Sequence, residues 1–244
     1  MSRLKGKTAV VTGGGSGIGF GAAKRFVDEG AFVYIFGRRQ ETLDAAAARL
    51  GSSARVVQGS VTDLSDLDRL YETVKAERGS LDILLANAGT GAFAPLGEIT
   101  PEHYDQIFDL NVKGLVFTVQ KALPLMTNGA SIILTGSSTG VMGTPAFSIY
   151  SATKAAVRNL ARSWALDLRQ TGIRVNVMSP GPITTELAQE VLGNEGMETI
   201  GATTVLGRMG DPSEAGAVAA FLASSDSSFM TGGEVFVDGG LAQV

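Results

Sequence analysis

The chain has 244 residues, of which 44% are hydrophobic and 18% charged, so its composition is that of a globular protein with a large buried core. The net charge of −4 offers no basic surplus to neutralise phosphates, which argues against a nucleic-acid partner. Cysteine is absent and His103 is the only histidine, so disulfides and cysteine nucleophiles are excluded and no metal site is expected.

Short apolar runs alternate with longer helical patterns from one end of the chain to the other. Strands are expected at Thr8–Thr12, Phe32–Phe36, Arg55–Gln58, Ile83–Ala86, Ser131–Thr135, Arg174–Met178 and Glu234–Val237. Helices are expected at about Gly17–Glu29, Glu41–Arg49, Leu64–Glu77, Pro101–Met126, Ser148–Gln170 and Pro212–Ala223. The strand runs are apolar nearly throughout, which is typical of a parallel sheet covered on both faces. We therefore expect an α/β fold, a doubly wound parallel seven-stranded Rossmann sandwich that forms a single domain over residues 1–244.

The segment from Thr184 to Asp211 breaks this alternation. It has weak periodicity and contains four glycines, namely Gly193, Gly196, Gly201 and Gly207. Irregular segments of this length often act as lids, so residues 184–211 are predicted to close over a substrate. An ordinary surface excursion is the alternative.

No apolar run is long enough to cross a membrane, and Met1 to Lys7 lacks the apolar stretch of a signal peptide. We expect a soluble, cytoplasmic protein without a membrane partner.

A glycine-rich turn follows the first strand. Thr12 runs into Gly13-Gly14-Gly15-Ser16-Gly17-Ile18-Gly19, and a helix follows. Such a turn lets backbone N–H groups approach a pyrophosphate at the helix N-terminus, with Gly17 and Gly19 allowing close backbone approach and close helix packing. Its position in the first βαβ unit favours a dinucleotide site over an ordinary turn.

The end of the second strand indicates which dinucleotide is bound. An enzyme that uses NAD carries an acid there for the ribose 2′-hydroxyl, whereas this strand ends in Phe36-Gly37-Arg38-Arg39. Guanidinium groups bind phosphate through paired hydrogen bonds. The sequence therefore favours NADP(H), and NAD(H) is the less favoured cofactor. The alternative is that Arg38 and Arg39 are solvated charges at the start of the next helix.

Tyr150 and Lys154 stand four residues apart, on one face of the predicted helix Ser148–Gln170. A free tyrosine has a pKa near 10, which is too high for acid–base work at neutral pH, and a nearby ammonium group favours the phenolate. We therefore expect Lys154 to lower the pKa of Tyr150. Alone, such a pair is usually a helix surface pair.

Together, these motifs resemble those of the short-chain dehydrogenase/reductase family, and the resemblance covers essentially the whole chain. The matching residues are Thr12-Gly13-x-x-x-Gly17-Ile18-Gly19, Asn87-Ala88-Gly89, Asn111, Ser137, Tyr150, Lys154 and Pro180-Gly181. They stand in the family's order, each after the strand or within the helix where the family has it.

The resemblance implies a catalytic tetrad. Tyr150 is the expected general acid in reduction and base in oxidation, and Ser137 binds the substrate oxygen. Lys154 holds the nicotinamide ribose, and Asn111 holds a water that links Lys154 to solvent. Ser138 is the neighbouring alternative to Ser137, but the family's spacing of thirteen residues to Tyr150 favours Ser137.

The family also implies further cofactor contacts. The full set of expected cofactor-binding residues is Gly13, Gly15, Ser16, Gly17, Ile18, Gly19, Gly37, Arg38, Arg39, Ser60, Val61, Asn87, Ala88, Gly89, Tyr150, Lys154, Pro180, Gly181, Ile183 and Thr185. Ser60 stands where many members have an aspartate for the adenine amine. Asp63, three residues later, is expected to cap the following helix instead.

The expected walls of the substrate pocket are the segment after Asn87-Ala88-Gly89, the segment after Ser137 and the predicted lid at Thr184–Asp211, and they are mainly apolar. They include Phe93, Leu96, Val141, Met142, Phe147, Leu187, Val191, Leu192, Val205 and Leu206. We therefore expect an uncharged, fairly hydrophobic ketone or secondary alcohol as substrate, such as an aryl ketone or a keto ester.

A reductase of acyl-carrier-protein substrates ranks second, because Met126–Gly129 and Gln170–Gly172 lack the basic residues that would dock the carrier. A sugar dehydrogenase is a further alternative, and a non-catalytic dinucleotide-binding regulator is a remote one. The apolar stripe of Val157, Leu160, Ala161, Trp164 and Leu168 packs on the sheet or, as the family implies, borders an interface of a homotetramer.

Overall fold

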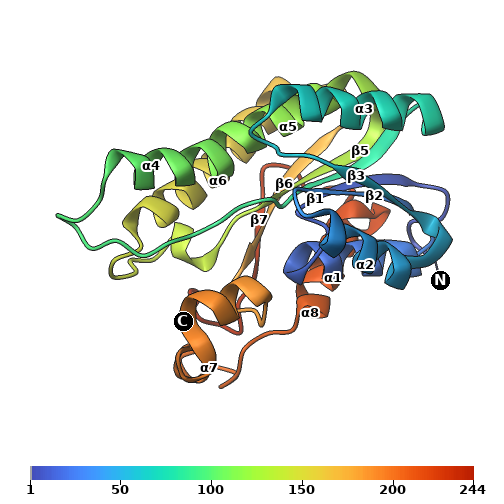
Figure 1. Cartoon of the computed structure of the whole chain (residues 1–244). Helices are drawn as coiled ribbons and strands as arrows, with labels where there is room; N and C mark the ends of the chain where they lie inside the picture. The colour runs from blue at the N-terminus through green and yellow to red at the C-terminus, as the bar shows by residue number, and fades with distance from the viewer. Residues whose placement is uncertain (1) are drawn as a thin grey trace.

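The computed structural model describes residues 2–244, and a sheet of seven parallel strands lies at its centre (Figure 1). The strands are β1 (Thr8–Thr12), β2 (Phe32–Gly37), β3 (Ala54–Gln58), β4 (Leu81–Ala86), β5 (Met126–Thr135), β6 (Arg174–Pro180) and β7 (Glu234–Val237). Their order in the sheet is β3-β2-β1-β4-β5-β6-β7, and every neighbouring pair is parallel. From β1, the sheet continues through β2 to β3 on one side and through β4, β5 and β6 to β7 on the other. The doubly wound Rossmann sheet is therefore confirmed.

Helices cover both faces of the sheet. They are α1 (Gly17–Asp28), α2 (Gln40–Leu50), α3 (Leu64–Arg78), α4 (Pro101–Phe108), α5 (Gly114–Ala122), α6 (Ser148–Asp167), α7 (Glu186–Ala202) and α8 (Pro212–Ala223). In Figure 1, α3, α5 and α6 lie on one face, while α1, α2 and α8 lie on the other. The carboxyl ends of the strands open towards α7, which stands apart from both layers.

The alternation of side chains along β1 explains why the strand runs are apolar throughout. Val10 belongs to the core under α3, α5 and α6, whereas Ala9 and Val11 belong to the core under α1, α2 and α8. Successive residues of a strand point to opposite faces. Because both faces are covered by helices, every position of the strand is buried.

The apolar stripe of α6 packs within the subunit. Val157 and Ala161 are fully buried in the sheet core, and Leu160, Trp164 and Leu168 pack against it. The stripe therefore needs no partner subunit to explain it. None of the helices within residues 2–244 is long and apolar enough to cross a lipid bilayer.

The helix expected at Pro101–Met126 is wrong as one continuous element. The segment divides into α4, a π-helical turn at Asp109–Lys113, α5 and a short 3₁₀ turn at Leu123–Leu125, and β5 already begins at Met126. Pro124 lies in the 3₁₀ turn, because proline lacks an N–H and cannot continue an α-helix. A π turn lets one residue bulge from the helix and is often found at functional sites.

The segment at 184–211 is more regular than its sequence indicates. Most of it forms α7, a helix of 17 residues interrupted at Gly193, whose φ of 66° and ψ of 179° are not helical. Glycine lowers helix propensity, which hides the helix from a periodicity analysis. Its role as a lid remains a prediction.

Candidate active site

The glycine-rich turn between β1 and α1 requires its glycines. Gly13 and Gly17 have φ values of 65° and 52°, a left-handed region that other residues rarely adopt. A Cβ atom on Gly19 would overlap the carbonyl oxygen of Gly13, so any side chain there would force the turn open. The turn therefore places the unpaired N–H groups at the start of α1 beyond the end of β1, where they can donate hydrogen bonds to an anionic ligand.

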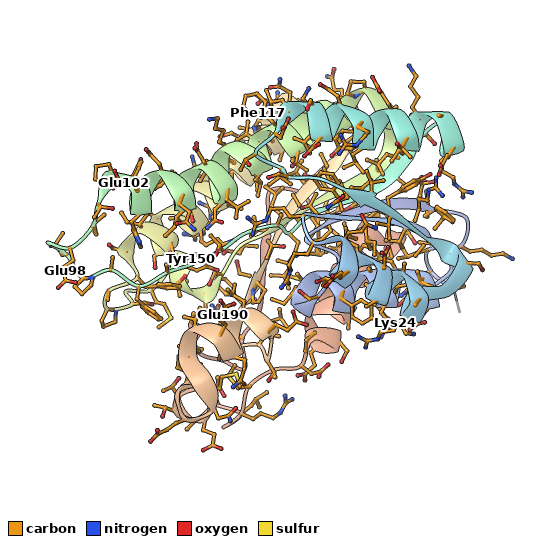
Figure 2. The ribbon with its side chains drawn as sticks, viewed as in Figure 1. Lys24, Glu98, Glu102, Phe117, Tyr150 and Glu190 are labelled. Carbon is orange, nitrogen blue, oxygen red and sulfur yellow. The ribbon has the colours of Figure 1, made fainter. Side chains whose placement is uncertain are left out.

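A cavity of about 730 Å³ lies at the carboxyl ends of the strands, beside this turn. Its lining includes most of the predicted cofactor residues, namely Gly13, Gly15, Ser16, Gly17, Ile18, Gly37, Arg38, Arg39, Ser60, Val61, Asn87, Ala88, Gly89, Tyr150, Lys154 and Thr185. Figure 2 shows Tyr150 and Glu190, two lining residues, on opposite sides of the opening between α6 and α7. The glycine cradle and the size of the cavity fit a dinucleotide.

Thr12 joins the glycine turn to the segment after β4. Its hydroxyl oxygen accepts hydrogen bonds from the backbone N–H groups of Asn87 and Ala88, both at 3.0 Å. The Asn87 side-chain amide in turn donates to the carbonyl oxygen of Thr12 at 3.1 Å. These bonds hold Asn87 and Ala88 against the turn, so two strand ends form one continuous wall of the cavity.

Arg38 and Arg39 are exposed and line the cavity where β2 ends. Arg39 lies 3.5 Å from the carboxylate of Glu186 at the start of α7, and both side chains are more than two-thirds exposed. An ion pair in such a solvated position is weak. The guanidinium group of Arg39 therefore remains available to a stronger anionic partner.

After β3, Ser60 stands where many family members have an aspartate for the adenine amine. Ser60 lines the cavity, and its backbone N–H donates to Asp66 at 2.8 Å. Asp63 accepts a hydrogen bond from the backbone N–H of Ser65 at 2.8 Å and caps α3, which confirms its predicted capping role.

Ser137, Tyr150 and Lys154 lie close together, and Tyr150 and Lys154 line the cavity. Lys154 is 5% exposed, donates from Nζ to the carbonyl oxygen of Thr135 at 2.8 Å, and lies 5.5 Å from the centre of the Tyr150 ring. Ser137 follows the end of β5, and its Oγ accepts hydrogen bonds from the N–H and hydroxyl of Thr139. The structure thus brings together three of the four predicted catalytic side chains.

Burial dominates the protonation of this group. It raises the pKa of Tyr150 above its ordinary value, and a hydrogen bond with Ser137 acts in the opposite direction. Burial also lowers the pKa of Lys154 to about 8. The net shift of the Tyr150 pKa is therefore upward and not downward as expected, because desolvation penalises the phenolate. The effect of Lys154 on this pKa remains a prediction.

Asn111 is the fourth predicted catalytic residue, and it lies behind the cavity wall in the π turn. Its side chain is 1% exposed, and its Nδ2 donates to the carbonyl oxygen of Thr90 at 2.8 Å and to the hydroxyl of Thr153 at 3.1 Å. Its Oδ1 accepts from the N–H of Thr90 at 2.9 Å. The side chain therefore links the segment after β4 to α6 by hydrogen bonds. Its expected role in holding a water remains a prediction.

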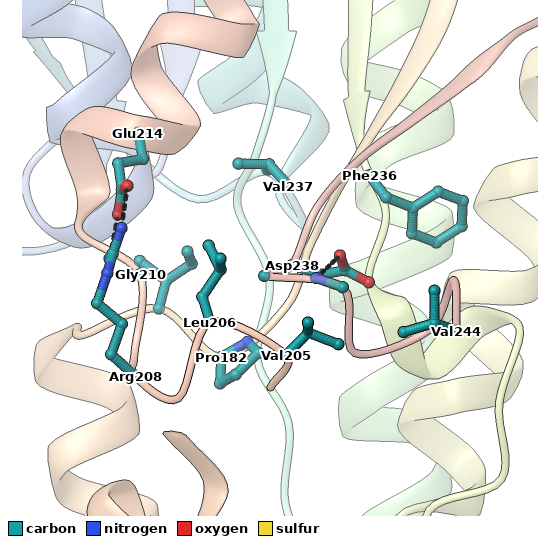
Figure 3. Close-up of a pocket in the computed structure, with 13 residues that line it drawn as sticks. Pro182, Val205, Leu206, Arg208, Gly210, Glu214, Phe236, Val237, Asp238 and Val244 are labelled. Carbon is teal, nitrogen blue, oxygen red and sulfur yellow. Dashed lines mark hydrogen bonds and ion pairs between the residues drawn. The ribbon is translucent and has the colours of Figure 1, made fainter. Parts of the chain in front are cut away.

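Some of the predicted residues do not line the cavity. Pro180, Gly181 and Ile183 lie at or beyond the end of β6, and Ile183 instead lines a second cavity of about 400 Å³ (Figure 3). An ion pair between Arg208 and Glu214, at 2.7 Å, stands at one side of that second cavity. The contact of Pro180, Gly181 and Ile183 with a cofactor remains a prediction.

Sequence reasoning also missed residues that line the main cavity. They include Phe36, Thr42, Leu43, Gly59, Thr90, Gly91, Leu110 and Thr135. Thr135 could have been found, because it ends β5 and ligands of such sheets bind at the carboxyl ends of the strands. Thr42 and Leu43 lie near the start of α2, three and four residues after Arg39, and no motif marks them.

Fold and site together define an oxidoreductase of the Rossmann class. A family model described as enoyl-(acyl carrier protein) reductase matches residues 13–242. A solved structure, the short-chain dehydrogenase/reductase SDR:glucose/ribitol dehydrogenase from Brucella melitensis, superposes with a TM-score of 0.94 at 30% identity and covers 99% of both chains. The chain belongs to the short-chain dehydrogenase/reductase family.

Two relatives illustrate its place in the family. Oxidoreductase asL5 of Sarocladium schorii is 66% identical over 246 residues, which cover 100% of this chain and 99% of that protein. The NADP-dependent (R)-specific alcohol dehydrogenase of Lentilactobacillus kefiri is 37% identical over 245 residues, which cover 98% of this chain and 97% of that protein.

Proposed function

We propose that the protein is an NADP(H)-dependent oxidoreductase that transfers a hydride between the nicotinamide and the carbonyl carbon of a small, uncharged, fairly hydrophobic ketone or the matching secondary alcohol. The observation that carries the proposal is the grouping of Ser137 with Tyr150 and Lys154, two residues that line a cavity with a glycine cradle. A dinucleotide-binding regulator without catalysis could use Lys154 to bind the ribose, but it would have no use for the Ser137 hydroxyl beside the phenol of Tyr150.

The chemistry of reduction follows from these three residues. When bound, NADPH supplies the hydride, which becomes a new C–H bond at the carbonyl carbon. Tyr150 donates its phenolic proton to the carbonyl oxygen and is left as phenolate, so a secondary alcohol forms. Burial raises the pKa of Tyr150 and keeps the phenol protonated, as an acid requires. Ser137 donates a hydrogen bond to the oxygen on which charge develops.

Lys154 has two proposed tasks. Its ammonium group binds the ribose of the nicotinamide half, and it stabilises the phenolate of Tyr150 once the proton has left. With a pKa of about 8, Lys154 is mainly protonated at neutral pH yet can release a proton at little cost. This property suits a group that must return a proton to Tyr150 after each turnover.

Arg38 and Arg39 support the choice of NADP(H) over NAD(H). Both are exposed at the cavity, no acid stands at Gly37, and a guanidinium group pairs well with a 2′-phosphate. That a relative at 37% identity is named as NADP-dependent points the same way.

The test is an assay of NADPH oxidation with a panel of ketones. Tyr150→Phe is expected to abolish turnover while NADPH binding, followed by fluorescence, survives. Ser137→Ala is expected to lower kcat about a hundredfold, as the loss of one oxyanion donor does. Tyr104→Phe, which removes a hydroxyl from an exposed side chain on α4, is the matched control. A Tyr150→Phe variant that kept most of its activity would show the assignment to be wrong.

A reductase of acyl-carrier-protein substrates is the second candidate, because the matching family model carries that description. The family also suggests a homotetramer, which we propose for this protein. Sedimentation velocity at micromolar concentration tests this assembly, and a monomeric protein would contradict it.

A further inference from the structure

An aromatic wall leads from the surface to the catalytic tyrosine. The rings of Phe93 and Phe147 have their centres 4.5 Å apart, and those of Phe147 and Tyr150 are also 4.5 Å apart, each pair tilted by 31°. Phe93 is 46% exposed, whereas Phe147 and Tyr150 are half-buried. The three side chains, which we call the aromatic wall, form a continuous stack that begins in solvent and ends at the reacting hydroxyl.

The backbone around the aromatic wall is built to hold these rings in place. A Cβ atom on Gly91 would lie 2.7 Å from the Phe147 ring and 3.0 Å from the Tyr150 ring, so the stack fits only against a glycine. Ala146 has a φ of 59°, a left-handed value that is costly for a residue with a side chain. Its carbonyl oxygen accepts a hydrogen bond from Ala94 at 2.7 Å, which ties the segments of Phe93 and Phe147 together.

Strain at a single residue persists only where the surrounding structure demands it. Ala146 directly precedes Phe147, and Ala94, which donates the bond to it, directly follows Phe93. The strained backbone therefore serves the position of the two phenylalanines, which have no role in the proposed hydride transfer itself.

The cavity next to the aromatic wall, which it meets at Tyr150 and Gly91, also has apolar side chains at its opening. Leu187 and Val191 on α7 line the same cavity as Tyr150 and are 43% and 37% exposed. The charged residues of α7 at this opening, Glu186 and Glu190, are both acidic, so α7 provides no cation for a carboxylate substrate. Together, these surfaces favour an uncharged molecule with a flat apolar face.

Resting on the proposed function, we infer that the preferred substrate is a ketone whose carbonyl carbon is attached to an aromatic ring, and that Phe147 and Phe93 select it by stacking. The carbonyl oxygen lies at Tyr150, the first ring packs beside Phe147, and a second fused ring reaches Phe93. Phe147 and Phe93 are thus specificity-determining residues for this reaction. Aromatic pairs in such arrangements gain affinity beyond simple burial of area.

The experiment compares kcat/KM for acetophenone, 2-acetylnaphthalene and cyclohexyl methyl ketone, which matches acetophenone in size but has a saturated ring. Phe147→Leu is expected to lower the ratio of acetophenone to cyclohexyl methyl ketone about twofold to tenfold, the range that stacking supplies. Phe93→Leu is expected to act mainly on 2-acetylnaphthalene. Phe229→Leu, on a fully exposed phenylalanine outside the cavity, is the control that should change neither ratio.

NADPH binding, measured by fluorescence titration, shows whether each variant retains its fold and cofactor site. Phe93 is exposed, so Phe93→Leu keeps the test valid if Phe147→Leu fails to fold. An active enzyme whose ratios stay the same in both variants would overturn the inference alone. A wild type that reduced none of the three ketones would overturn the proposed function, and the inference with it.

Discussion

Replacing Gly37 with aspartate is expected to turn the cofactor preference from NADPH towards NADH. Gly37 ends β2, lines the cavity and precedes the arginine pair. Its φ is not in the left-handed region, and a Cβ atom there would meet only Leu43 at 3.6 Å, an ordinary van der Waals contact. An aspartate therefore fits without strain, and its carboxylate is placed to accept the ribose 2′-hydroxyl and repel a 2′-phosphate.

The magnitude follows from the contacts that change. A hydrogen bond to a charged group contributes about 1.5–3 kcal/mol, so the loss of one such bond to the 2′-phosphate lowers kcat/KM for NADPH roughly tenfold to a hundredfold. The new bond to the 2′-hydroxyl raises kcat/KM for NADH by a smaller factor. The assay is steady-state reduction of one ketone with each cofactor, and the quantity is the ratio of the two kcat/KM values.

Ala48→Asp is the matched control for this prediction. It adds the same charge to an exposed position on α2 that does not line the cavity, so the ratio should stay within about twofold of the wild type. The reasoning would be refuted by a wild type that prefers NADH, or by a Gly37→Asp variant whose ratio equals that of Ala48→Asp.

Three further predictions concern groups around the cavity. Burial gives Lys154 a pKa of about 8 against 10.5 in the unfolded chain, so between these values the folded state binds fewer protons and stability rises with pH. Urea titrations from pH 7.5 to 10.5 should show the wild type gaining up to about 3 kcal/mol relative to Lys154→Met, and parallel curves would contradict this. Glu186→Gln frees Arg39 from an exposed ion pair and should tighten NADPH binding by up to about fivefold without affecting NADH; equal effects on both cofactors would refute it. Ala146→Gly relieves a left-handed alanine and should raise the melting temperature while lowering the preference for aryl ketones, whereas a lower melting temperature would argue against strain there.

The sheet and the cofactor cradle could be predicted because their signals are local. Strands buried on both faces are apolar at every position, and a glycine-rich turn between the first strand and its helix is typical of a dinucleotide site. The proposed preference for NADP(H) could be predicted from the arginine pair for the same reason, since the residues directly after β2 are read from the sequence alone. All seven strands include their expected ranges or match them closely, as the bounds of β1 and β7 illustrate.

What the sequence could not predict depends on contacts between distant segments. The π turn at Asp109–Lys113 coincides with bonds from Asn111 to Thr90 and Thr153, which no periodicity contains. Phe93 and Phe147 are both among the expected walls of the substrate pocket, but the stacking of their rings with Tyr150 arises only through the fold. The upward shift in the pKa of Tyr150 could not be predicted, because it comes from burial, which sequence spacing cannot measure.

The three bonds of Asn111 lead to a last prediction, about Thr153. Thr153 is fully buried, its hydroxyl donates to the carbonyl oxygen of Tyr150 at 2.7 Å, and it accepts from Asn111 at 3.1 Å. This one hydroxyl therefore joins the catalytic helix to the π turn and, through Asn111, to the segment at Thr90. We expect Thr153 to act as a positioning residue for Tyr150.

Thr153→Val keeps the shape of the side chain and removes only the hydroxyl. Since a net hydrogen bond contributes about 1 kcal/mol, kcat should fall about fivefold while the dissociation constant of NADPH stays unchanged. Thr153→Ser restores the hydroxyl and should restore kcat, even though it removes a buried methyl group and lowers stability. A purely structural role predicts the reverse order, in which the valine variant is active and the serine variant is impaired, so the ranking of kcat between these two variants decides the question.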